Sequence, residues 1–147
     1  MLIEKKELCS LIPHDGSMCL LEGVLSWNET EIQCVAISHT DHANPLRNGE
    51  RLASVHLLEY GAQAMAVHGG ILAREAGYQM RSGYLAALRD VILQQEFIDQ
   101  IKTPLIIKAQ SIASSADSFM YNFTISTNEK LLASARATVI AQKSTTQ

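Results

Sequence analysis

The 147-residue sequence has no basic cluster and no long apolar run. Its 12 Lys and Arg are balanced by 15 Asp and Glu, and no stretch of basic residues would follow a phosphate backbone. No segment approaches the roughly 18 to 20 consecutive apolar residues that span a bilayer. We therefore expect a protein that neither binds nucleic acid nor crosses a membrane.

Cysteine is also scarce, and its spacing is uninformative about metals. Cys9, Cys19 and Cys34 are odd in number and show no Cys-x-x-Cys motif, and no N-terminal apolar segment is long enough for a signal peptide. This pattern predicts reduced, semi-buried thiols in the cytoplasm. His39 and His42 have no third ligand at a recognisable spacing, so no metal site is expected. With 47% hydrophobic residues, residues 1–147 can form one domain whose core needs neither disulfide nor metal.

The hydrophobic pattern predicts one long helix among strands. Residues 54–74 are alanine-rich and apolar nearly all round, with Ser54 as the N-cap and a stop near Gly77. Because no helix returns between the later strands, we expect an α+β protein whose antiparallel sheet wraps around this helix. The segments predicted as strands are 18–27, 31–38, 83–96, 104–112, 119–126 and 130–141.

A narrow polar stripe interrupts the apolar helix. His56, Glu59 and Gln63 stand at i, i+3 and i+7, so at roughly 100° per residue they fall within about 60° of one another. A carboxylate inside a buried helix is costly unless it is paired, hydrogen-bonded or protonated. Glu59 is therefore the first candidate for chemistry, and a position at the edge of a dimer interface is the alternative.

Two segments resemble the beta-hydroxyacyl-acyl carrier protein dehydratases of the hot-dog superfamily. LIPHDGSMCLLEGV, residues 11–24, is similar to that family's Leu-Pro-His opening, which precedes an apolar strand and an acidic residue. LEYGAQA, residues 58–64, is similar to the helix motif Glu-Ala-x-Ala-Gln, whose glutamate is the catalytic acid. Glu59 and Gln63 match this motif in place, and Tyr60 replaces its first alanine. The resemblance implies a hot-dog fold, with about six antiparallel strands around one long central helix.

The loop before the helix departs from the family's Gly-His-Phe-Pro motif. The dehydratases place the catalytic histidine two residues before the proline, whereas this chain reads His42-Ala43-Asn44-Pro45. His42 also precedes Glu59 by 17 positions, more than is usual in the family, and no Pro-Gly pair opens the helix. The chain is thus more similar to a divergent branch of dehydratases, including those of aryl-polyene and related polyketide-like pathways.

The resemblance implies dehydration of a beta-hydroxyacyl thioester held on acyl carrier protein, without a metal or redox cofactor. This chemistry needs a base for the alpha proton and an acid for the departing hydroxyl. Glu59 is the expected acid and His42 the expected base, with His39, His56 or no histidine as alternatives. The expected substrate-binding residues are Asn44, Pro45, His56 and Gln63.

The surroundings of this site are also expected from the pattern. His68 and His14 are interpreted as structural, although the resemblance places His14 near the site. An apolar tunnel between helix and sheet would take the acyl chain, and the sheet edge predicts a homodimer or higher oligomer whose subunits complete each other's sites. Two other functions stay open: a hot-dog thioesterase, which needs no histidine base, and a non-catalytic acyl-binding or scaffold subunit of a dehydratase complex.

Overall fold

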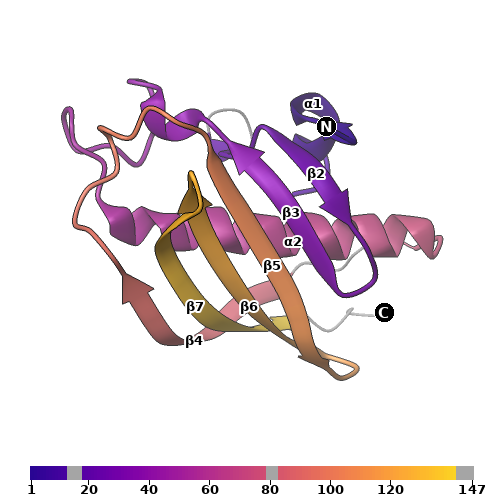
Figure 1. Cartoon of the computed structure of the whole chain (residues 1–147). Helices are drawn as coiled ribbons and strands as arrows, with labels where there is room; N and C mark the ends of the chain where they lie inside the picture. Colours follow the sequence, from indigo (N-terminus) through magenta and orange to yellow (C-terminus); the bar gives the residue numbers. More distant parts are fainter. Residues whose placement is uncertain (13–17, 79–82, 142–147) are drawn as a thin grey trace.

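The computed structural model describes residues 1–12, 18–78 and 83–141 (Figure 1). Its strands pair antiparallel in the order β1-β2-β3-β5-β6-β7-β4, which confirms the α+β prediction and adds a seventh strand, β1. The 3-10 turns are η2 (Ser38–Thr40) and η3 (Ser54–His56). The helices and strands are β1 (Ile3–Glu4), α1 (Lys5–Cys9), β2 (Gly23–Trp27), β3 (Glu31–Ala36), α2 (Leu57–Glu75), β4 (Gly83–Leu93), β5 (Leu105–Ser114), β6 (Ser118–Thr127) and β7 (Lys130–Ala141).

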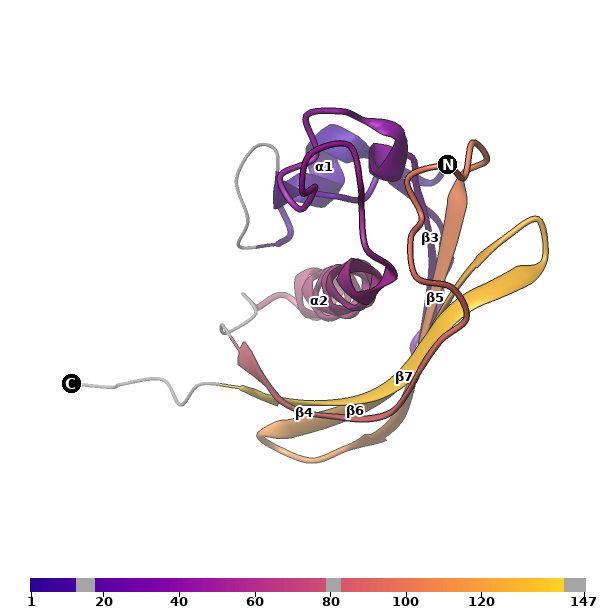
Figure 2. The same ribbon diagram turned by 90° about the vertical axis from the view of Figure 1, so that its left-hand side faces the viewer.

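Helix α2 lies in the concave side of the sheet. Figure 2 looks along α2 and shows the strands curving around one side of it, with α1 and the loops on the other side. Side chains from β5 and β6, such as Ile107 and Phe123, are buried against the helix. Gly61 permits this contact, because a Cβ there would overlap the Phe123 ring. The arrangement confirms the expected hot-dog fold.

The two ends of α2 differ from each other in how they are capped. The prediction of Ser54 as the N-cap is wrong, because η3 occupies that turn and His56 caps α2 without a side-chain hydrogen bond. At the other end Gly77 takes φ of +81°, and the Tyr78 amide donates to the Ala73 carbonyl at 3.0 Å. Glycine adopts this left-handed conformation at little cost, so the predicted stop is confirmed. Among the described residues no helix is long and apolar enough to cross a membrane.

The segment before β2 is not the strand that its composition predicted. The strand begins at Gly23 rather than Met18. The Leu20 amide donates to Gln63 Oε1 at 2.9 Å, so its hydrogen bond goes to α2 instead of to a neighbouring strand. The residues ahead of β2 therefore serve as a backbone partner for the helix, although their apolar side chains are buried like those of a strand.

The cysteines correct the expectation of three reduced thiols. Cys9, at the end of α1, is bonded to Cys19, and their Cα atoms lie 5.8 Å apart. Packing of α1 beside the segment before β2 brings the two residues together, which the spacing in the sequence did not indicate. Cys34 is free and buried in β3, and its burial raises the pKa of the thiol to about 12.

Strand β4, 11 residues long, forms one end of the sheet, and among the described residues β7 is its one strand partner. Its outward side chains include apolar groups that are well exposed: Ile92, for example, is 49% exposed. The opposite end of the sheet is formed by β1, which has only 2 residues. The apolar residues exposed on β4 are Tyr84, Leu85, Val91, Ile92 and Leu93.

Candidate functional site

The first turns of α2 hold a carboxyl group against a buried amide. Glu59 is half-buried, and Gln63, one turn later, is 1% exposed. The Gln63 amide donates to Glu59 Oε1 at 3.1 Å and to the Met18 carbonyl at 2.6 Å, while its oxygen accepts from the Leu20 amide at 2.9 Å. Since a buried amide is stable only when its polar atoms are paired, Gln63 fixes both the Glu59 carboxyl and the backbone at 18–20.

A second buried polar cluster lies beside this one, around Tyr60. Its side chain is fully buried, and its hydroxyl is 2.8 Å from Ser38 Oγ and 3.2 Å from the Asn44 amide nitrogen. Ser38 Oγ in turn donates to the Leu20 carbonyl at 2.8 Å. Burial raises the pKa of Tyr60, which keeps its hydroxyl available as a donor. The sequence pattern singled out Tyr60 only as a departure from the helix motif, and it did not indicate Ser38.

Asn44, expected to bind substrate, is 6% exposed. Its amide nitrogen also donates to the Ser38 carbonyl at 2.9 Å, and its side-chain oxygen accepts from the Leu46 amide at 2.9 Å. An asparagine that bonds its own backbone two residues on is typical of a tight turn. The side chain therefore shapes the loop, and its role in substrate binding stays a prediction.

His42 and Pro45 lie exposed on the loop that Asn44 shapes. The Arg47 guanidinium holds this loop from one side, because it donates to the carbonyls of His39, Asp41 and Glu50 at 2.8 to 2.9 Å. The loop thus presents the His42 ring to solvent from a backbone that is closely hydrogen-bonded.

Two other histidines were alternatives for the base. His56 is half-buried at the end of η3, three residues before Glu59, so it precedes the acid by about one helical turn. His39 is fully buried, and its Nε2 lies 3.0 Å from the Thr103 carbonyl. Burial lowers the pKa of His39, although the Thr103 carbonyl acts in the opposite direction. His39 is therefore engaged inside the protein, whereas His56 stands on the same helical turn as the acid.

His68 lies farther along α2. Its ring is fully buried, with Nδ1 at 2.7 Å from the Tyr121 hydroxyl and Nε2 at 2.9 Å from the Asn28 carbonyl. Burial lowers the pKa of His68, so the neutral ring joins the two neighbours. This placement agrees with the structural role expected of His68, and His14 lies outside the described residues.

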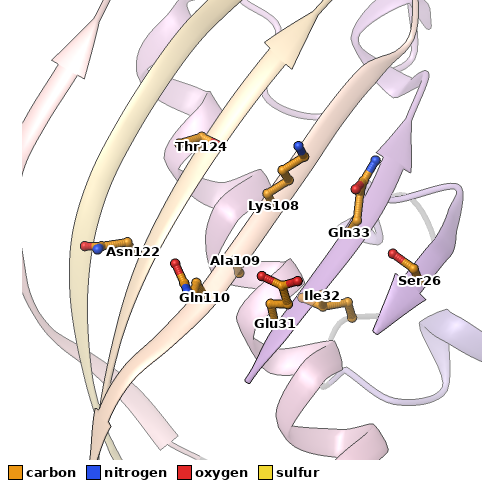
Figure 3. Close-up of a pocket in the computed structure, with 9 residues that line it drawn as sticks. All are labelled: Ser26, Glu31, Ile32, Gln33, Lys108, Ala109, Gln110, Asn122 and Thr124. Carbon is orange, nitrogen blue, oxygen red and sulfur yellow. The ribbon is translucent and has the colours of Figure 1, made fainter. Parts of the chain in front are cut away.

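A hollow of about 260 Å³ opens on the face of the sheet away from α2 (Figure 3). Most of the residues that line it are polar and come from neighbouring strands, with Gln33 of β3 paired to Lys108 of β5 and Lys108 to Thr124 of β6. The hollow is not the expected apolar tunnel, which would lie on the other face of the sheet, beside Glu59. That tunnel stays a prediction.

Comparison with known proteins agrees with this architecture. One chain of the dehydratase heterocomplex ApeI:P from Xenorhabdus doucetiae is 23% identical, with a TM-score of 0.84 over 94% of this chain and 92% of that one. A hypothetical thioesterase with coenzyme A from Streptococcus pneumoniae is 10% identical, with a TM-score of 0.60 over 84% and 87%. The PaaI protein of E. coli is 14% identical, with a TM-score of 0.59 over 80% of each chain.

These structures share the fold, and a family comparison is more specific. Among curated proteins no sequence matches. The family described as ApeP-like, ApeP dehydratase, matches residues 6–147, which include the polar clusters around Gln63 and around Tyr60. The chain therefore belongs to the ApeP-like dehydratase family.

Proposed function

We propose that this chain takes part in the removal of water from a beta-hydroxyacyl thioester on acyl carrier protein, in the biosynthesis of an aryl polyene or a related lipid. The product would be the trans-2-enoyl thioester. Membership of a dehydratase family over residues 6–147 supports the reaction class. The observation that carries the proposal is the Glu59 carboxyl, held by the buried Gln63 amide at the start of the central helix.

In this reaction Glu59 would act as the acid. A base takes the alpha proton, the electron pair left behind forms the double bond, and the hydroxyl leaves as water with a proton from the Glu59 carboxyl. His42 is the proposed base, and His56 is the alternative because it precedes Glu59 by one turn. The hydrogen bond from Gln63 would orient the acid, and Asn44 and Pro45 would border the substrate from the loop.

We further propose that β4 pairs with the β4 edge of a second hot-dog chain. Among the described residues its 11 residues pair with a strand on one side alone, and they carry exposed apolar side chains, a combination that soluble proteins rarely leave uncovered. A second copy of this chain is the partner expected from the sequence. A different subunit is the alternative, since the similar ApeI:P structure is a heterocomplex. The acyl tunnel would be closed only when the second chain is in place.

A non-catalytic role within a dehydratase complex is the second candidate. It is favoured by the histidines: His39 and His68 are buried and bonded to Thr103 and to Tyr121, while His42 is exposed on its loop. In that case this chain would stabilise a catalytic partner along β4. The cytoplasm is the proposed compartment, and the Cys9–Cys19 bond is the observation against it.

The test is to follow the intact mass of a short beta-hydroxyacyl carrier-protein thioester. Wild type and Glu59→Gln are each assayed alone and after mixing with a separately purified hot-dog dehydratase of the ApeI type. Loss of one water with wild type, but not with Glu59→Gln, supports the proposed acid. Loss of water only in the mixtures, and equally with both proteins, supports the non-catalytic role. Loss of the acyl group would instead indicate a thioesterase and refute both.

A further inference from the structure

We propose that Tyr60 is a positioning residue that sets the loop of residues 38–47, and with it His42, relative to Glu59. The inference rests on the proposed function, in which these two groups flank the substrate. Its structural basis is a continuous chain of hydrogen bonds, which begins at Glu59 and ends in the loop.

The backbone of Leu20 is the centre of this chain of hydrogen bonds. On its N–H side, Leu20 donates to the Gln63 oxygen, and the Gln63 nitrogen donates to Glu59. On its carbonyl side, Leu20 accepts from Ser38 Oγ at 2.8 Å. Leu20, which precedes β2, is therefore hydrogen-bonded both to Gln63, which holds Glu59, and to Ser38, where the loop begins.

Tyr60 extends the chain from Ser38 into the loop. Because Ser38 Oγ already donates to Leu20, the Tyr60 hydroxyl donates to Ser38 and accepts from Asn44 at 3.2 Å. Asn44 in turn accepts from the Leu46 amide. The hydroxyl thus links α2 directly to this turn, and an alanine at the same helix position could not supply that link.

Tyr60 acts through these neighbours and not on the substrate. Its side chain is fully buried, and its hydroxyl is already hydrogen-bonded to Ser38 and Asn44. Tyr60 stands directly after Glu59 in α2, so the same helical turn carries the acid and the anchor of the loop. A displacement of about 1 Å between catalytic groups can slow a reaction by roughly a hundredfold, so this anchor would matter to turnover.

The test compares Tyr60→Phe with Tyr121→Phe. Both substitutions remove one buried hydroxyl and keep the ring, but the Tyr121 hydroxyl bonds His68, away from the loop. Tyr60→Phe should speed hydrogen exchange at the Leu46 amide by about fivefold or more. It should also lower kcat by about tenfold or more while KM stays within about twofold. Tyr121→Phe should change neither quantity, although it will lower thermal stability comparably.

The outcomes distinguish a failure of the role proposed for Tyr60 from a failure of the proposed function. Unchanged exchange in the loop with Tyr60→Phe, or an equal increase with Tyr121→Phe, overturns the proposal. An equal fall of kcat in both variants overturns it as well, because a general loss of stability would then explain the effect. If no protein turns over the thioester, the proposed function fails, and the exchange at Leu46 alone decides whether Tyr60 positions the loop.

Discussion

Replacing Gln63 by glutamate should make the stability of this protein depend on pH. The amide now donates to the Met18 carbonyl and accepts from the Leu20 amide, and it also donates to Glu59. A protonated carboxyl can reproduce the first two bonds. An ionised one cannot donate to Met18, and it places a negative charge in a position that is 1% exposed, next to the Glu59 carboxyl.

The size of the effect follows from the pKa that the introduced carboxyl has in the unfolded chain. Burial raises the pKa of the introduced carboxyl in the folded state, so the stability of the variant is complete below the unfolded pKa of about 4.3 and is lost progressively as pH rises from there to the folded value. If the folded protein keeps the proton at pH 7, the loss of stability is about 1.36 kcal/mol for each unit between the unfolded pKa of about 4.3 and pH 7, or roughly 3.7 kcal/mol. We expect a loss of about 2 to 4 kcal/mol at pH 7 and little loss at pH 4.

The assay is urea unfolding of Gln63→Glu and wild type at several pH values and one protein concentration, because an oligomer's stability depends on concentration. Gln63→Met is the matched control. It leaves Met18 and Leu20 unpaired, so it should lose roughly 2 to 5 kcal/mol at every pH. Equal losses for Gln63→Glu at pH 4 and pH 7 would refute the reasoning, since the hydrogen bonds of the amide would then not determine the stability of this site.

Three further predictions concern stability. Gly61→Ala should lower the free energy of unfolding by about 1 to 2 kcal/mol in urea, because overlap with Phe123 exceeds the gain in helix propensity; a stabilised variant would contradict the close packing. Burial lowers the pKa of His68, so as pH falls the unfolded state takes up the proton first, and the free energy of unfolding should decrease below about pH 6.5. His68→Gln should make the difference in the free energy of unfolding between pH 5 and pH 7 smaller than in wild type. The double substitution Cys9→Ser, Cys19→Ser should cost about 3 kcal/mol, and dithiothreitol should then have no further effect on the melting temperature.

Elements with strong local signals were predictable from the sequence. The alternation of 119–126 and 130–141 corresponds to β6 and β7, and the turn between them has positive φ at Asn128 and Glu129, as a two-residue hairpin requires. Helix α2 is marked by alanine and by Gly77. In each case a periodic pattern and a terminating residue occur within one segment.

Other features depend on contacts between distant segments, and these were not predictable. The two residues of β1 and the five of α1 are too short to carry a period. The bond between Cys9 and Cys19 needs the packing of α1. At the site, the helical spacing placed Gln63 on the face of Glu59, but the link from Tyr60 through Ser38 crosses three segments of the chain. The proposed roles of His42 and Asn44 stay predictions.

The contrast between the two ends of the sheet has a consequence for the life of the chain in the cell. Strand β1 has only 2 residues, whereas β4 has 11, and among the described residues one edge of β4 pairs with no strand. An uncovered edge of this length is a template for aggregation and a target for chaperones and proteases. If the proposed partner is a different subunit, the abundance of this protein would follow the supply of that subunit, because unpaired copies would be removed.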